Sequence, residues 1–143
     1  MIWVPPADMP ALVARDWRAF YRTVLATYGI TPAEYRALYL AQLGRCYICR
    51  TARGKHPDDP QGKGGRRLGV DHNHLIGGRA SVRGLLCTGS LSANTCNRLI
   101  ARYPVDALRR AVIYVEEAPA QGVLARLAEG AVTDEELNGM ALT

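Results

Sequence analysis

The chain has 143 residues, which is enough for one domain or for a small module with helical extensions. No apolar run is long enough to cross a bilayer, so we expect no membrane-spanning segment. The net charge of +5 is carried almost wholly by arginine, whose guanidinium matches phosphate oxygens in a bidentate way. Charge alone leaves a nucleic-acid partner and a merely soluble surface equally open.

The amino terminus gives no sign of export. The segment Met1–Pro6 has neither a basic n-region nor an apolar h-region, so we expect no signal peptide and a cytoplasmic protein. In a reducing compartment, four cysteines are more often metal ligands than disulfides. Two disulfides remain the alternative.

Two helices are predicted before the first cysteine. Apolar and aromatic residues recur at helical spacing from Pro10 to Tyr28, and Gly29 can end this helix in a left-handed cap. The second helix has a clear start, because Thr31-Pro32-Ala33-Glu34 offers an N-cap threonine, a proline at the first helical position and a glutamate that closes a capping box. We expect Gly44 to end it.

The cysteines fall into two groups. Cys46-x-x-Cys49 can supply two thiolates from one tight turn, which is typical of a zinc knuckle, although a redox dithiol has the same spacing. Cys87 and Cys96 favour zinc, because the four thiols together make a closed site with no open coordination position. Such a site is structural.

The segment from Arg50 to Arg67 is rich in glycine, proline and charge and predicts a mobile loop. Its basic residues are compatible with DNA contact and equally with a solvated loop. His56 within it is expected to be exposed and inert.

A β-hairpin is predicted next. Its strands are the short apolar runs Leu68 to Asp71 and Val82 to Leu86, which are separated by glycines.

The sequence Asp71-His72-Asn73-His74 places one carboxylate and two imidazoles within four residues. Such a group can hold a hard divalent ion and activate a water. Because neighbouring strand residues point to opposite faces, one of Asp71 and His72 can bind metal while the other faces substrate. His74 either contacts the phosphate or leaving group, or is a hydrogen-bonding residue that stiffens the turn.

Asn97 directly follows Cys96 and would start the next helix, with an amide oxygen suited to magnesium. A basic chain with this centre suggests hydrolysis of nucleic-acid phosphodiesters.

Pro104 begins a further helix with one apolar face, Pro119 stops it, and two short helices follow, from Ala120 to Glu129 and from Thr133. These apolar faces exceed what the small centre can cover, and a homodimer is the simplest solution.

The order of these motifs resembles the phage recombination endonuclease VII family, a branch of the HNH nucleases with a ββα-metal centre. The resemblance covers roughly Tyr28 to Val115, and several spaced motifs in register are more specific than one short pattern. The segments that carry it are Tyr28–Tyr35, Gln42–Cys49, Val70–His74, Val82–Cys87 and Cys96–Arg98.

The resemblance implies an α+β, mostly α fold. Residues 1–44 would form N-terminal helices, 45–103 a zinc-stabilised HNH (ββα-metal) nuclease module, and 104–143 C-terminal helices used for dimerisation. The implied protein is a homodimer that acts in phage recombination and cuts branched DNA, including four-way junctions, with one nick from each subunit.

The resemblance also implies a role for each matching residue. Asp71 and Asn97 would hold a catalytic Mg²⁺ or Mn²⁺, His72 would be the general base, and His74 would support it. The implied structural zinc ligands are Cys46, Cys49, Cys87 and Cys96.

Two features depart from the family pattern. Eight residues, Thr88–Thr95, separate the last two cysteines where the family has a second Cys-x-x-Cys, and Gly69 stands where some relatives carry a histidine. The alternative functions are a general HNH nicking endonuclease acting on duplex DNA, a non-catalytic zinc DNA-binding module, and a redox or regulatory protein that uses the first cysteine pair.

Overall fold

The computed structural model describes residues 3–52, 55–59, 66–89 and 94–130. Within these ranges the chain is an α+β protein, mostly helical, with one two-stranded sheet, which confirms the predicted fold class. The chain divides into two compact units, Met1–Arg102 and Tyr103–Thr143.

The first helix, α1 (Ala11–Tyr28), buries the stripe of its surface that carries Trp17, Tyr21 and Val24. It ends as predicted, because Gly29 adopts a left-handed conformation with φ of 70° and donates its N–H to the carbonyl of Leu25.

The second helix, α2 (Pro32–Ala41), begins with the predicted capping box. The Glu34 N–H donates to Thr31 Oγ1 at 3.2 Å, and the Thr31 N–H donates to Glu34 Oε1 at 3.1 Å. The helix ends at Ala41, three residues before Gly44. The turn that follows needs two left-handed residues, Leu43 and Gly44, so the helix stops earlier than the glycine alone predicts.

The sheet is the predicted hairpin of β1 (Leu68–His72) and β2 (Val82–Cys87), each strand one residue longer than expected. The strands are antiparallel, with Leu68 opposite Cys87 and Asp71 opposite Gly84. A register shift between Asp71 and His72 interrupts the pairing, and a short 3-10 helix, η1 (Arg79–Ser81), leads into β2.

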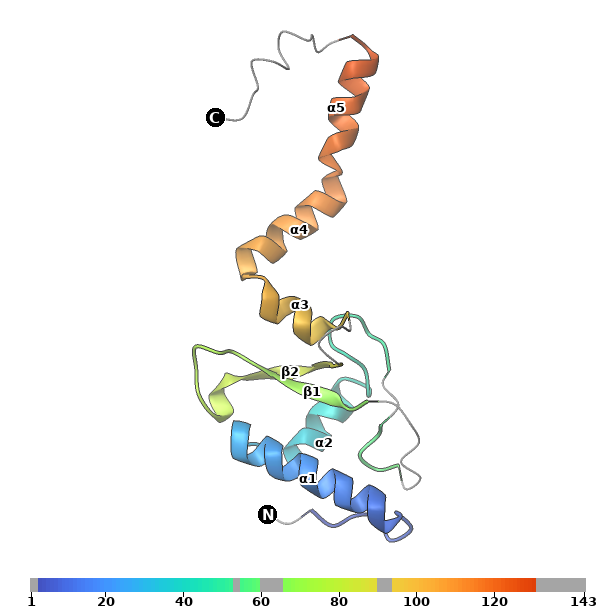
Figure 1. Cartoon of the computed structure of the whole chain (residues 1–143), viewed down its shortest axis with the longest axis vertical. Coiled ribbons are helices and arrows are strands. Elements are labelled where there is room, and N and C mark those ends of the chain that lie inside the picture. Colours follow the sequence, from blue (N-terminus) through green and yellow to red (C-terminus); the bar gives the residue numbers. More distant parts are fainter. Residues whose placement is uncertain (1–2, 53–54, 60–65, 90–93, 131–143) are drawn as a thin grey trace. The chain divides into compact units, whose positions relative to one another are not determined.

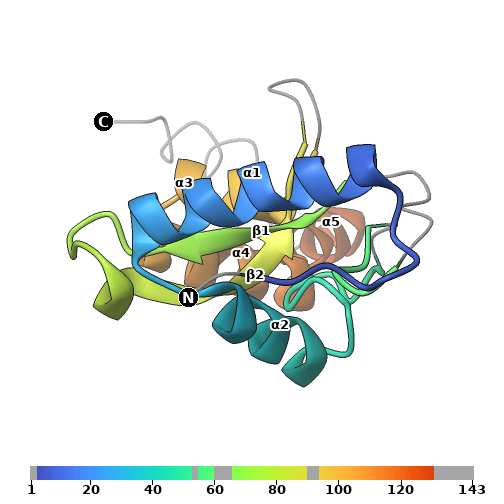
Figure 2. The same ribbon diagram turned by 90° about the horizontal axis from the view of Figure 1, so that it is seen from below.

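The core of the first unit lies between the hairpin and the two N-terminal helices. Figures 1 and 2 show α1 and α2 on one side of β1 and β2, and Figure 1 shows α3 (Cys96–Arg102) on the other. Tyr35 is fully buried and donates its hydroxyl to the carbonyl of Leu68 at 2.7 Å, which ties α2 to the start of β1. Trp17 and Leu85 are also fully buried there. The strand that carries Asp71 therefore rests on a packed aromatic core.

The second unit contains α4 (Val105–Glu117) and α5 (Pro119–Ala128). Pro104, predicted to begin a helix, is the N-cap of α4, and α4 ends at Glu117, just before the Pro119 that was predicted to stop it. The next helix begins at Pro119 and ends at Ala128, one residue earlier at each end than predicted. The helix predicted from Thr133 and parts of the Arg50–Arg67 loop fall outside the described residues. No helix in the described ranges is long and apolar enough to cross a membrane.

Candidate active site and metal centre

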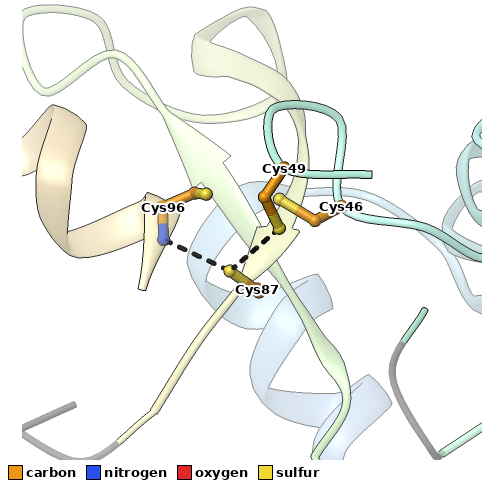
Figure 3. Close-up of side chains that lie close together, drawn as sticks. All are labelled: Cys46, Cys49, Cys87 and Cys96. Carbon is orange, nitrogen blue, oxygen red and sulfur yellow. Dashed lines mark hydrogen bonds between the residues drawn. The ribbon is translucent and has the colours of Figure 1, made fainter. Parts of the chain in front are cut away.

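The four cysteines converge from three parts of the first unit (Figure 3). Cys46 and Cys49 come from the turn after α2, Cys87 is the last residue of β2, and Cys96 is the first residue of α3. Their four sulfur atoms all lie within 4.8 Å of one another. The clustering expected from the spacing is therefore confirmed, and it includes Cys96 despite the long Thr88–Thr95 insertion.

The backbone holds this cluster in place. The Tyr47 N–H donates to the carbonyl of Leu85 at 3.3 Å, which fixes the knuckle against β2. The Cys96 N–H donates to Cys87 Sγ at 3.2 Å, which fixes the start of α3 against the end of the same strand (Figure 3).

The thiol set fits tetrahedral zinc. Bonds of about 2.3 Å to a central ion place tetrahedral sulfurs about 3.8 Å apart, and Cys49 Sγ lies 3.9 Å from Cys87 Sγ. Hydrogen bonds from Thr51 lower the pKa of the Cys49 thiol to about 6, while burial and the neighbouring thiols raise the pKa of Cys96 to about 12. Four thiolates this close together would repel one another, so all four can be deprotonated only when a cation compensates their charge.

Asp71 lies on β1 with its side chain only 8% exposed. Both of its carboxylate oxygens accept hydrogen bonds from Arg83 on β2, from Nε at 2.7 Å and from Nη2 at 3.0 Å. The carboxylate raises the pKa of Arg83 further above its ordinary value. The register shift allows this pair: Asp71 lies opposite Gly84 and His72 opposite Val82, so Arg83 is the extra residue of β2 and is not held to the opposite face of the sheet.

His72 points to a different environment from Asp71. Its ring centroid lies 4.3 Å from that of His74, with the planes nearly parallel at 29°, and 5.0 Å from the ring of Tyr28 at the end of α1. His72 is half-buried and His74 is exposed. The two imidazoles therefore form one stack that rests on α1.

Asn97 is half-buried near the start of α3 and lines a surface hollow of about 610 Å³. No hydrogen bond joins Asn97 to Asp71 in the described part of the chain. The carboxylate and amide oxygens have the hard-donor chemistry that Mg²⁺ prefers, but Arg83 engages both oxygens of Asp71 here. The other residues around the hollow are Thr88, Gly89, Thr95, Arg98, Ala101 and Arg102.

Two contributors to the site were missed from the sequence. One is Arg83, which only the strand register could have placed beside Asp71. The other is Gln42, whose Nε2 donates to the carbonyls of Arg45 at 2.9 Å and Leu85 at 2.8 Å, while its Oε1 accepts from the Leu85 N–H at 2.9 Å. Gln42 thus joins the end of α2, the first knuckle and β2.

Gly69 lies on β1 two residues before Asp71. The side chain of Thr88 covers this glycine, and a Cβ at position 69 would overlap Thr88 Cγ2. Thr88 is itself held by a hydrogen bond from its hydroxyl to the carbonyl of Arg67 at 3.3 Å. The smaller residue at position 69 is therefore matched by a neighbour that fills the space.

Comparisons with known proteins place the chain among phage proteins of one family. The sequence model of the recombination endonuclease VII family matches residues 21–117. Two curated relatives are the Gene 59 proteins of Mycobacterium phages D29 and L5, which are 43% and 40% identical over 114 residues, or 78% of this chain. The chain spans 58% of the length of each relative. No solved structure matches.

Proposed function

The chain belongs to the recombination endonuclease VII family, and from this membership we propose that it is a metal-dependent HNH endonuclease that cuts branched DNA such as four-way (Holliday) junctions. The observation that supports this most is the single compact unit that holds the four-cysteine cluster, Asp71 and His72 on β1, and Asn97 on α3. All of these residues lie within the matched range 21–117.

Each of these groups has a part in the proposed reaction. Zinc on the four cysteines would hold β2, α3 and the knuckle together and would do no chemistry. Asp71 and Asn97 would hold a Mg²⁺ or Mn²⁺ ion, and that ion would neutralise negative charge at the scissile phosphate. A neutral His72 would accept the proton of the attacking water, and His74 would support its ring from the stacked position.

The partners belong to the same proposal. Surface arginines would bind the DNA backbone without reading sequence, so binding should weaken steeply as salt rises. Each of two copies would make one nick at a branch, with the apolar face of α4 as the contact between the copies. A phage nuclease of this kind would work in the cytoplasm of the host cell.

The test is a Mg²⁺-dependent cleavage assay on a synthetic four-way junction and on a linear duplex built from the same arms. Paired nicks in the junction with the duplex left intact are the expected result. Equal cutting of both substrates would instead indicate a general HNH nicking enzyme. Binding of the junction without cutting would indicate a non-catalytic zinc module.

His72→Ala is the matched variant for this assay. Because the imidazole is the proposed base, we expect cleavage to fall roughly 100- to 10,000-fold while junction binding by gel shift stays unchanged. Cleavage at the wild-type rate would remove His72 from the mechanism.

A further inference from the structure

The ion pair between Asp71 and Arg83 joins two groups with unequal access to solvent. The Asp71 side chain is 8% exposed, whereas that of Arg83 is 46% exposed. A carboxylate this buried needs a positive partner, because an unpaired buried charge is strongly unfavourable. In this structure the partner is the guanidinium, which uses both carboxylate oxygens.

We propose that Arg83 is the resident counter-cation of Asp71, and that a divalent metal ion loads only as Arg83 leaves that carboxylate. This inference rests on the proposed function, in which Asp71 is a metal ligand. The guanidinium and the metal ion compete for the same carboxylate, because the bidentate fork engages both oxygens and two cations held there would repel each other. Arg83 is therefore a positioning residue that sets how tightly the metal binds.

The released guanidinium has a natural acceptor in the proposed substrate. Arg83 is half-exposed, and a guanidinium pairs with phosphate oxygens as it does with carboxylate oxygens. When a DNA phosphate pairs with Arg83, the carboxylate of Asp71 becomes available to bind the metal ion. When a metal ion binds Asp71, the guanidinium of Arg83 becomes available to bind DNA. By linkage, DNA and metal then strengthen each other's binding.

A purely structural role for the pair makes a different prediction. If Arg83 only clamps β1 to β2, its removal should loosen the hairpin and leave metal affinity unchanged or weaker. If Arg83 competes with the metal, its removal should tighten metal binding. The sign of the change separates the two roles.

The experiment measures Mn²⁺ affinity of the full, zinc-loaded chain without DNA by electron paramagnetic resonance. Arg83→Met is expected to bind Mn²⁺ roughly tenfold tighter, because a charge-assisted hydrogen-bonded partner no longer has to be displaced. Arg83→Lys keeps the charge but loses the fork, so its affinity should lie between those of Arg83→Met and the wild type. Arg79→Met, which removes an arginine paired with Glu34 instead, is the matched control and should leave Mn²⁺ affinity unchanged.

Uncleavable junction DNA provides the second arm. It should tighten Mn²⁺ binding more in the wild type than in Arg83→Met, because the variant has no guanidinium left to be drawn away. Zinc content and circular dichroism report folding, and Arg83→Lys decides the question if Arg83→Met does not fold.

The possible failures are distinct. The inference is overturned if the wild type binds Mn²⁺ and cuts the junction, while removal of Arg83 leaves Mn²⁺ affinity equal or weaker. If the wild type and every variant fail both to bind Mn²⁺ and to cut, the proposed metal-dependent function fails, and the inference fails with it.

Discussion

At the scale of single residues, the position of His72 depends on its aromatic neighbours. The ring centroid of His72 lies 5.0 Å from that of Tyr28 and 4.3 Å from that of His74. A general base works only when its ring is held within reach of the water it activates. Tyr28, which the periodicity of α1 assigns only to a helix, therefore supports the candidate base.

We predict that Tyr28→Ala lowers the junction cleavage rate roughly 10- to 100-fold, because the unsupported His72 ring samples unproductive positions. Single-turnover kinetics would measure the rate, and a gel shift would show DNA binding unchanged. Tyr28→Phe keeps the ring contact and should cut at close to the wild-type rate. If Tyr28→Ala also cuts normally, the aromatic contact has no catalytic consequence.

At the scale of elements, the sequence predicts what is local. Periodic apolar residues and caps locate α1 and α2, with Gly29 and the Thr31–Glu34 capping box in their predicted roles. The pair of glycines between two apolar runs locates the hairpin to within one residue at each strand end. These features depend on neighbours within a few positions along the chain.

What the sequence did not reveal depends on register between distant segments. Gln42 reaches Leu85, and Arg83 reaches Asp71, only because β1 and β2 pair as they do and α2 packs beneath them. A helix-propensity or strand-periodicity argument contains no information about which side chains face each other across a sheet. The convergence of Cys96 on the other thiols was expected from the number and grouping of the cysteines, and it is confirmed.

The zinc cluster gives a prediction that depends on pH. The pKa of Cys96 is raised to about 12, so this thiol holds its proton at neutral pH and must lose it when zinc binds. Apparent zinc affinity should therefore rise with pH, by roughly tenfold per pH unit for each proton released. Cys49, with a pKa lowered to about 6, should contribute little to this slope above pH 7.

Competition with a chromogenic chelator at pH 6, 7 and 8 would measure that slope. Cys46→Ser should lose the zinc at all three values and lower the thermal midpoint of unfolding, because Cys46 is fully buried within the cluster. Zinc affinity that does not change with pH, or full zinc content in Cys46→Ser, would contradict a four-thiolate site.

At the scale of the whole molecule, α4 carries apolar side chains that face solvent in the single chain. Val112, Ile113 and Val115 are 55%, 50% and 75% exposed. Val112 and Val115 share a face with Leu108 at helical spacing. Burying each valine against a second copy would contribute about 1.5 kcal/mol or more, which supports the proposed homodimer.

We predict that Val112→Asp converts a dimer into a monomer in sedimentation velocity experiments, because a charge would be buried at the centre of the contact. The monomer should give single nicks in a junction in place of paired ones. Arg110→Asp, about 200° around the helix from Val112, is the matched control and should remain dimeric. A wild-type chain that sediments at 15.6 kDa would rule out this interface.

The contact between Gly69 and Thr88 has an evolutionary consequence. A side chain at position 69 needs the volume that the Thr88 methyl group fills, and Thr88 is held in place by its bond to Arg67. Relatives with a histidine at position 69 should therefore carry a residue at position 88 that leaves this volume free. The two positions are expected to change together over generations, and a single exchange at position 69 should be selected against until position 88 has changed.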